Sequence, residues 1–445
     1  MQSVRLKIML KKLKTKSKDM KKGVLLFLTL TIVLHFFTVD AIGQVVPSET
    51  KTDMRVATFD MDVTPPVGYK MAYGTMVNSY DLGLRAKGLV LLGAGQPIVL
   101  VSFDWIGIKN ECLDAFKKSL ADAAGTIPER VAVHSIHPHD TPYGSNLKDS
   151  FVLSVINRLE SVVRISLDKA IPVTHIGLGE AEVYKVASSR RPLGTDGKVT
   201  GSRFTSCSDS SLRAEPEGVI DPILSSVSFW NKEKPVAILN YYATHPQSYY
   251  RMGIACPDYP GIARFMFQLE VPDALNIYFT GAGGNVGAGK YNDGSHENRG
   301  ILARRLADGM KRAWLNTKRF PIVPSDVQWK VEPVTLPLDS VRSKRGTLWQ
   351  RQKEGKQIDL QCLALNNARI LFMPGELFVE YQLAAKKMRP DLFVVMAAYG
   401  DLGPGYIPTD IAFTQGGYEV SVANVIPGVE AVLMNAISKL LDVKE

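Results

Sequence analysis

The segment that most constrains this chain is a short apolar strand, residues 131–136, which runs into a loop rich in histidine and proline. It reads Val-Ala-Val-His134-Ser-Ile-His137-Pro-His139-Asp-Thr-Pro. Strand ends that open into such loops are where α/β enzymes place their chemistry. His137 and His139 are two residues apart, so on an extended backbone both face the same side, and His134 faces the other. One His-x-His pair is compatible either with a metal site or with hydrogen-bonded loop histidines.

Two later segments repeat this pattern of a strand that ends in polar groups. Residues 237–244 form an apolar run into His245-Pro246, and residues 370–373 lead through Pro-Gly to Glu376, which we expect to open a helix. Two His-Pro turns in a histidine-poor chain favour a shared metal. Glu376 either complements a helix dipole or supplies the carboxylate of a His₂–carboxylate zinc site. Tyr406, in a glycine-rich loop, is a packing aromatic, an oxyanion donor or a phenolate ligand.

Strands and helices alternate along the whole chain, which predicts an α/β or mixed α+β fold. We expect one large domain with central mixed sheets, helices around them, and the metal site in loops at the strand ends. Continuous apolar runs such as 97–103 are typical of strands buried on both faces. Further strands are expected at 56–63, 88–93, 131–136, 175–187, 226–231, 236–242, 275–280, 327–335, 369–373 and 392–398. Helices are expected at 110–124, 150–170, 297–315, 376–387 and 420–440.

The first 43 residues have the composition of a secretory signal. A basic stretch precedes an apolar run at 23–39, and Ala41-Ile-Gly43 suits cleavage before Gln44. We therefore expect export to the periplasm or medium, with residues 44–445 as the mature domain. The competing interpretation is an uncleaved membrane anchor at 23–39.

The charge of the chain lies mostly in that leader. Residues 1–43 carry nine Lys/Arg and two Asp/Glu, so without them the formal net charge falls from +9 to +2. A nearly neutral mature chain lacks the excess of positive charge that is typical of proteins that bind nucleic acid. Membrane contact is expected only through the N-terminal segment, and the oligomeric state stays open. Four scattered cysteines without CxxC pairing leave disulfide pairing open as well.

Several short motifs, in order, resemble the neutral/alkaline non-lysosomal ceramidases. His137-Pro-His139-Asp-Thr-Pro is similar to the family's His-Thr-His-Ser-Gly-Pro, and Ala243-Thr-His245-Pro-Gln-Ser to its Ala-Ile-His-Pro-Val-Ser. Pro374-Gly-Glu376, Tyr406-Ile-Pro-Thr, Val101-Ser-Phe-Asp104 and Ser189-Arg190-Arg-Pro resemble further family segments. The set spans roughly residues 54–435 and implies that family's catalytic domain.

The resemblance implies a set of site residues. Zinc would be held by His137, His245, Glu376 and Tyr406, with His139 and Arg190 as polar groups beside it. Such ligands leave zinc able to acidify water to a pKa of about 7 and to polarise a carbonyl, while a phenol or guanidinium stabilises the oxyanion.

Other polar residues are given supporting roles. His139 is expected to relay a proton to the leaving amine, with Asp258 as the weaker candidate for that role. Asp104 is expected to orient an imidazole ligand, and His134 is expected in the core or just behind the ligands.

The chain departs from the family pattern in two places. Gly287, in the segment Gly284-Asn285-Val-Gly287, stands where the family has its proposed catalytic serine. We expect this loop (Gly284, Asn285 and Gly287) to widen the pocket or to approach the substrate with its backbone. The chain also ends at Glu445 without the immunoglobulin-like domain that the resemblance would imply.

We therefore predict an exported zinc hydrolase that cleaves an amide (N-acyl) or related bond in a small-molecule or lipid-like substrate. One alternative is a zinc hydrolase acting on a sugar-derived or ester substrate, which the polar loop at 281–289 and Arg190 would suit. The other is a binding protein that has kept the fold and lost catalysis, which Gly287 would favour.

Overall fold

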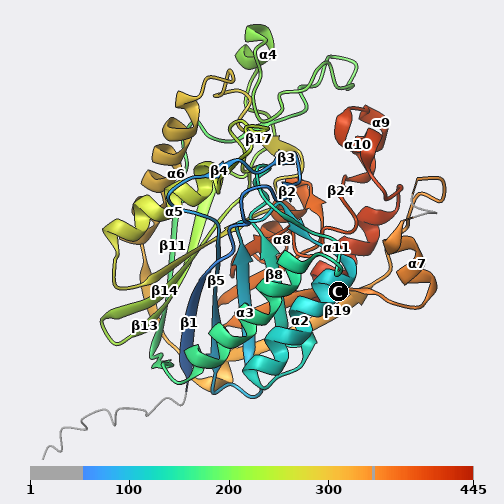
Figure 1. The fold of residues 1–445 in the computed structure, drawn as a ribbon. Helices are drawn as coiled ribbons and strands as arrows, with labels where there is room; N and C mark the ends of the chain where they lie inside the picture. Colours follow the sequence, from blue (N-terminus) through green and yellow to red (C-terminus); the bar gives the residue numbers. More distant parts are fainter. Residues whose placement is uncertain (1–53, 343–345, 444–445) are drawn as a thin grey trace, which may run out of the picture. The chain divides into compact units, whose positions relative to one another are not determined.

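The computed structural model describes residues 54–342 and 346–443, and Thr52–Glu445 is one compact unit (Figure 1). The expected signal or anchor at 1–43 and the domain boundary at Gln44 lie outside the described residues. No helix in the described part of the chain is both long and apolar enough to cross a membrane.

The first sheet has the strand order β10-β1-β5-β6-β8, and α2 and α3 pack on it. Strands β1, β5 and β6 are antiparallel neighbours, whereas β6 and β8 are parallel and joined through α2. A left-handed Gly125 ends α2, and the Asp149 side chain caps the start of α3. The bounds are β1 (Arg55–Asp62), β5 (Arg85–Leu92), β6 (Ile98–Phe103), α2 (Asn110–Ala124), β8 (Val131–Ser135), α3 (Ser150–Leu167) and β10 (Ile171–Pro172).

The second sheet has the order β16-β14-β13-β11-β18 and packs against α5 and α6. Its β14–β16 pair is parallel and its other pairs are antiparallel. The bounds are β11 (His175–Glu182), β13 (Ile223–Asn231), β14 (Lys234–Tyr242), α5 (Asp258–Glu270), β16 (Leu275–Thr280), α6 (Glu297–Leu315) and β18 (Lys318–Pro321).

The third sheet has the order β19-β20-β21-β23, with β21 and β23 parallel, and packs against α8 and α11. The bounds are β19 (Val327–Val334), β20 (Ile358–Leu365), β21 (Ala368–Phe372), α8 (Val379–Met388), β23 (Phe393–Ala397) and α11 (Val429–Leu440). Shorter elements are β2 (Lys70–Met71), β3 (Gly74–Thr75), β4 (Asn78–Ser79), β7 (Gly107–Ile108), η1 (Pro128–Arg130), β9 (Tyr143–Gly144), β12 (Ser188–Ser189), α4 (Ser210–Ala214), β15 (Ile254–Ala255), β17 (Val286–Gly287), η2 (Pro324–Asp326), α7 (Thr347–Lys353), β22 (Glu376–Leu377), β24 (Tyr406–Ile407), α9 (Asp410–Gln415) and α10 (Tyr418–Val422).

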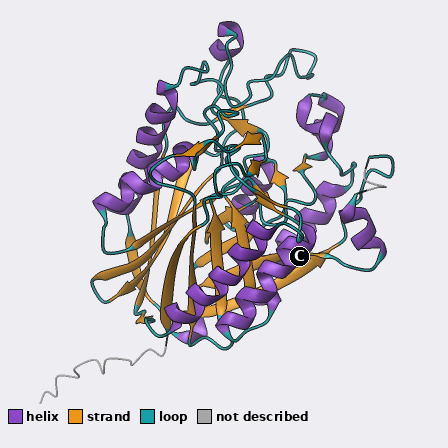
Figure 2. Cartoon of the chain, viewed as in Figure 1, coloured by secondary structure: helices purple, strands orange, loops and turns teal. Residues whose placement is uncertain are grey.

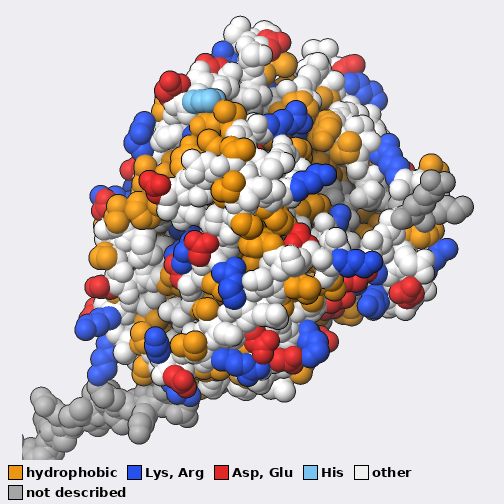
Figure 3. Space-filling model, viewed as in Figure 1, with side chains coloured by type: hydrophobic (Ala, Val, Ile, Leu, Met, Phe, Trp, Pro, Cys, Tyr) orange, Lys and Arg blue, Asp and Glu red, His pale blue; other side chains and the backbone are white. Residues whose placement is uncertain are grey.

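The three sheets share one core and carry their helices on the outside (Figure 2). Side chains of all three sheets, such as Leu100, Leu239 and Ile370, belong to one buried cluster. Each sheet is therefore covered on both faces, which explains the continuous apolar runs of its central strands. On the face seen in Figure 3, apolar side chains form groups separated by polar and charged ones.

One residue, through its side chain and its backbone, joins the ends of three strands from different sheets. Thr280, at the end of β16, donates from its hydroxyl to the Ile136 carbonyl, and its own carbonyl accepts from the Ala398 amide. The Ser135 amide donates in turn to the Tyr399 carbonyl. The loops that follow β8, β14, β21 and β23 consequently emerge on one side of the molecule.

The predicted fold class is confirmed, but two predicted helices are wrong in detail. Glu376 does not open a helix: it lies in β22, which pairs in parallel with β24, and α8 begins at Val379. The Glu376 amide donates to the Gly405 carbonyl, so tertiary pairing overrides helix propensity. The helix expected at 420–440 is two helices, α10 and α11, because Pro427 interrupts it. The strand expected at 175–187 ends at Glu182.

Candidate metal centre

Three side chains from different strand ends converge on one point. His137 follows β8, His245 follows β14, and Glu376 lies in β22 just after β21. One ligand atom from each lies within 4.8 Å of the others. Glu376 Oε2 is 3.0 Å from His245 Nε2 and 3.5 Å from His137 Nε2. The two strand-end histidines and the carboxylate singled out by the sequence are therefore adjacent.

Backbone carbonyls orient both imidazoles. His137 Nδ1 is bonded to the Ile106 carbonyl, and His245 Nδ1 to the Gly283 carbonyl. A carbonyl accepts only, so each Nδ1 carries a proton and each ring turns its Nε2 toward Glu376. A metal ion between the two Nε2 atoms and the carboxylate would replace the protons that these groups otherwise share. This donor set fits a divalent metal of the zinc type.

The protonation states suit metal ligation. Burial, followed by the charge of Arg190, lowers the pKa of His245 to about 4. Although burial opposes it, the neighbouring His137 and His245 hold the pKa of Glu376 well below its ordinary value. The imidazole of His245 is thus neutral and the carboxylate ionised near neutral pH, as metal ligands must be.

The backbone around the ligands is held in unusual conformations. His137 has φ +74° and Tyr399 has φ +58°, in the left-handed region that non-glycine residues rarely adopt. The Tyr399 ring packs on His137 with centroids 4.7 Å apart, and Gln247 Nε2 donates to the His137 carbonyl. Such backbone conformations persist where the surroundings enforce them, and they occur often at functional sites.

Arg190 and Tyr406 lie beside the three ligands. Arg190 Nη1 is 3.1 Å from the Tyr406 hydroxyl and 3.2 Å from His245 Nε2, and the hydroxyl is 3.4 Å from the same nitrogen. Although Arg190 opposes it, burial raises the pKa of Tyr406 well above its ordinary value. The phenol is therefore neutral and can donate a hydrogen bond.

Glu419 anchors Arg190 and escaped the sequence analysis. Its oxygens lie 3.2 Å from Arg190 Nε and 3.1 Å from Arg191 Nη1, and its side chain is fully buried. Glu419 lies in the short helix α10, far along the chain from both arginines. No motif around it marks it, because its role depends only on tertiary packing.

His139 lies in the same pocket, between two tyrosines. Its ring stacks on Tyr73 at 4.6 Å and meets the edge of Tyr250 at the same distance. Burial, followed by the proximity of His137, lowers the pKa of His139 well below its ordinary value. Its buried Nδ1 has no hydrogen-bond partner among the described residues. Sequence reasoning found His139 but not the two tyrosines.

Two of the expected supporting residues have other partners. Asp104 does not orient an imidazole: it forms a bidentate pair with Arg264, at 2.7 and 2.8 Å, and the Ile106 carbonyl orients His137 instead. His134 lies in the core, where it bonds Ser102 Oγ and accepts from the Thr280 amide. Burial lowers the pKa of His134 to about 3.

Asp258, the weaker candidate for proton relay, lies behind the His245 loop. Its carboxylate accepts from the amide and hydroxyl of Ser248 and pairs with Arg299. It does not line the pocket over the ligands. The structure thus gives Asp258 a place in a network that supports the His245 loop.

The loop of Gly284, Asn285 and Gly287 lies beneath the site and does not line its pocket. A Cβ at Gly284 would lie 2.2 Å from the Glu376 carbonyl oxygen, so only glycine allows this close approach. Asn285 donates to Glu380 and accepts from the Val379 amide. Gly287 pairs with Ser188 in the β12–β17 ladder. The expectation that this loop contacts the substrate is therefore corrected: it positions the Glu376 segment.

A pocket of about 540 Å³ lies over the ligands. This volume is in the range of small-molecule sites. It is lined by Tyr73, Ile106, His137, His139, Tyr143, Arg190, Phe204, Thr205, Ser206, His245, Tyr250, Glu376, Leu402, Tyr406 and Tyr418.

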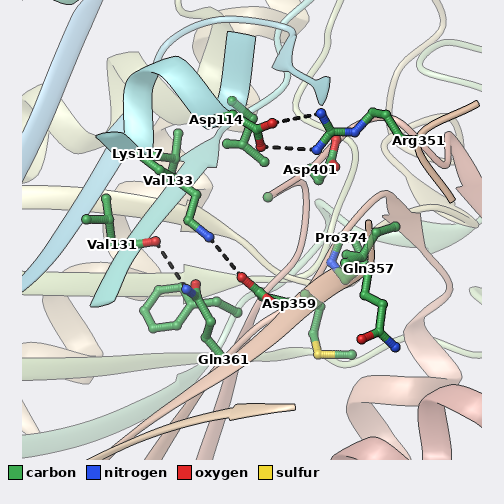
Figure 4. Close-up of a pocket in the computed structure, with 15 residues that line it drawn as sticks. Asp114, Lys117, Val131, Val133, Arg351, Gln357, Asp359, Gln361, Pro374 and Asp401 are labelled. Carbon is green, nitrogen blue, oxygen red and sulfur yellow. Dashed lines mark hydrogen bonds and ion pairs between the residues drawn. The ribbon is translucent and has the colours of Figure 1, made fainter. Parts of the chain in front are cut away.

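A second, much smaller cavity of about 70 Å³ lies between α2 and the third sheet (Figure 4). Arg351 pairs there with Asp114 and Lys117 with Asp359, while Asp401 accepts from the amides of Asn110 and Gly403. The cavity offers a ligand little beyond room for a few water molecules. The four cysteines, Cys112, Cys207, Cys256 and Cys362, are all buried and form no disulfide.

Comparison with known proteins relates this chain to others by its fold. The sequence matches no family model, and no curated protein is significantly similar to it. Its structure is similar to that of the neutral ceramidase from Pseudomonas aeruginosa, with 15% identity, 88% of this chain and 74% of that chain covered, and a TM-score of 0.63. A ceramidase complexed with C2 matches at 14% identity, with 88% and 75% covered and a TM-score of 0.63. The chain thus has a neutral-ceramidase-like fold.

Proposed function

We propose that this chain is an exported, zinc-dependent hydrolase that cleaves an amide (N-acyl) bond. One observation carries the proposal: two imidazole Nε2 atoms and a carboxylate meet at one point beneath an open pocket. Three protein ligands with room for a further one are typical of catalytic zinc sites. The ceramidase-like fold supports amide hydrolysis as the reaction class.

His137, His245 and Glu376 would hold the metal, and the Tyr406 phenol is near enough to complete the set. Zinc, when bound, would lower the pKa of a water molecule and polarise the scissile carbonyl. Arg190 and Tyr406 would donate hydrogen bonds to the oxygen on which negative charge develops. Glu419 holds the guanidinium of Arg190 for that task.

His139 would give the proton to the leaving amine. It lines the pocket, and its low pKa leaves it neutral at rest, able to take up a proton and release it within one turnover. Gly287 offers no hydroxyl at the position where the similar family has a serine, so no nucleophile is assigned there.

The test is metal content by elemental analysis, paired with turnover of a panel of N-acyl compounds. Wild type should hold about one zinc per chain, and His137→Ala and His245→Ala should lose both the metal and the activity. His175→Ala, in β11 and outside the pocket, is the matched control. A folded wild type that takes up no zinc would overturn the proposal. Zinc without turnover of any amide or ester would instead support a binding protein.

Export is tested separately, by sequencing the N-terminus of the protein made in cells with their secretion machinery. A mature chain beginning at Gln44 is the expected outcome. A full-length chain that remains in the membrane fraction would support the anchor at 23–39 instead.

A further inference from the structure

The walls of the pocket are aromatic and hydroxylated. The first wall is Tyr73, His139 and Tyr250, whose ring centroids are 4.6 to 5.0 Å apart. The second wall is Phe204, Tyr406 and Tyr418, in which Tyr418 meets the other two rings edge-on at 5.2 and 5.9 Å. Two groups of rings that line one cavity suit a flat, ring-shaped ligand.

The polar groups of the pocket suit a ligand with several hydroxyls. Five tyrosine phenols, together with Thr205 and Ser206, line it. The His139 ring also lines the pocket. Ile106 and Leu402 are the only aliphatic residues among the described residues that line the pocket. A long alkyl chain would therefore find little aliphatic surface in the pocket.

We propose that the substrate is a hydroxylated ring that carries an N-acyl group, such as an N-acyl amino sugar. This inference rests on the hydrolase function proposed above and names its substrate class. The apolar faces of such a ring would pack on the two walls, and its hydroxyls would bond the phenols and His139. Water adds to the acyl carbon, the C–N bond breaks, and the products are a carboxylate and an amine that has gained the proton.

The experiment compares N-acetylglucosamine with N-acetyl-sphingosine on the zinc-loaded full chain, measured as released acetate. The sugar should have a kcat/KM at least roughly tenfold higher. Tyr73→Ala should raise the KM for the sugar about tenfold with little change in kcat, because it removes one stacking face. Tyr73→Phe, which keeps that face, should restore most of the loss. Tyr184→Ala, exposed and outside the pocket, is the control.

A second readout does not depend on turnover. Equilibrium dialysis of the chelator-treated full chain, which lacks the metal needed for turnover, should show N-acetylglucosamine bound to wild type and bound about tenfold more weakly by Tyr73→Ala. Cleavage of N-acetyl-sphingosine without cleavage or binding of the sugar would overturn this inference and leave the hydrolase proposal intact. If a zinc-loaded chain cleaved neither compound and bound no sugar, this inference would fall, and the panel of N-acyl compounds described above would decide the hydrolase proposal. An unchanged KM in Tyr73→Ala would also overturn the inference.

Discussion

At the scale of single residues, burial is what sets the chemistry of the histidines. His134 and His245 are both buried, and burial is the largest cause of their low pKa values, about 3 and about 4. One is packed in the core and the other belongs to the candidate metal centre. The same desolvation therefore favours the neutral form both of a core residue and of a candidate metal ligand.

We expect the metal-free protein to lose stability as the pH falls below about 6.5. Both folded-state pKa values lie below the ordinary value of 6.5, so the unfolded chain binds protons first. Each histidine then costs up to about 1.4 kcal/mol per pH unit until its folded pKa is reached. Urea unfolding between pH 7.5 and 5 measures this slope. His134→Asn should show a smaller slope, and an equal slope would contradict the assignment.

Breaking the Glu419 anchor should cost more stability than breaking a surface pair. Glu419→Gln leaves Arg190 and Arg191 buried without their counterion, and we expect a loss of about 3 kcal/mol in the free energy of unfolding. Asp122→Asn, which breaks the exposed pair with Lys118, should cost less than about 1 kcal/mol. If denaturant titrations gave both variants the same loss in the free energy of unfolding, the buried pairs would contribute no more stability than the surface pair.

At the scale of elements, the site depends on where backbones approach each other. Gly284 packs against the carbonyls of Glu376 and Leu377, and a Cβ there would lie 2.2 and 2.9 Å from their oxygens. Gly284→Ala should shift β22, destabilise the fold by about 1–3 kcal/mol and weaken zinc binding at least roughly tenfold.

Gly300→Ala, inside α6 with only the flexible end of Arg304 near it, is the matched control for Gly284→Ala. It should be neutral or slightly stabilising, because alanine favours a helix. Measuring the zinc affinity and the thermal unfolding of both variants tests this prediction. Zinc affinity retained in Gly284→Ala would show that β22 tolerates the shift.

Local patterns were enough to predict the strands that carry the ligands. Apolar runs that end in His137-Pro and His245-Pro mark both histidines as candidate ligands. Both the apolar strand and the polar residues that follow it can be recognised in the sequence. The resemblance to known motifs added Arg190 and Tyr406 to the set of candidate site residues. Glu376 was singled out as a candidate ligand but placed in the wrong element, because its strand exists only through pairing with a segment thirty residues away.

The remaining parts of the site depend on tertiary contacts that leave no local trace. Tyr73 and Tyr250 reach the pocket from loops, and Glu419 reaches Arg190 from α10. None of these segments carries a motif. Asp104 follows a buried strand, as a carboxylate that orients an imidazole would, but it forms an ion pair with Arg264 from α5. A single sequence does not reveal which buried carboxylate meets which cation.

At the scale of the whole molecule, the three candidate ligands come from segments that follow strands of three different sheets. His137 follows the first sheet, His245 the second, and Glu376 the third. Zinc binding should therefore stabilise the entire unit and not one part of it. At a zinc concentration about a hundredfold above Kd, the gain is about 2.7 kcal/mol, and the Tm should rise by about 3 °C.

Calorimetry of zinc-loaded and chelator-treated protein measures this shift. A single transition that moves as a whole is expected. A split transition, in which only part of the heat moves, would show that one sheet unfolds without the others. His137→Ala should be insensitive to the chelator.

This three-sheet origin of the ligands also fixes an order of events during folding. An ion held by all three sheets cannot be captured until the last of them has docked. In refolding experiments, zinc uptake should therefore lag behind the recovery of secondary structure and coincide with burial of the shared core. Only completely folded molecules would bind the ion and gain its stabilisation. Partly folded molecules would lack it and would be cleaved more readily by proteases.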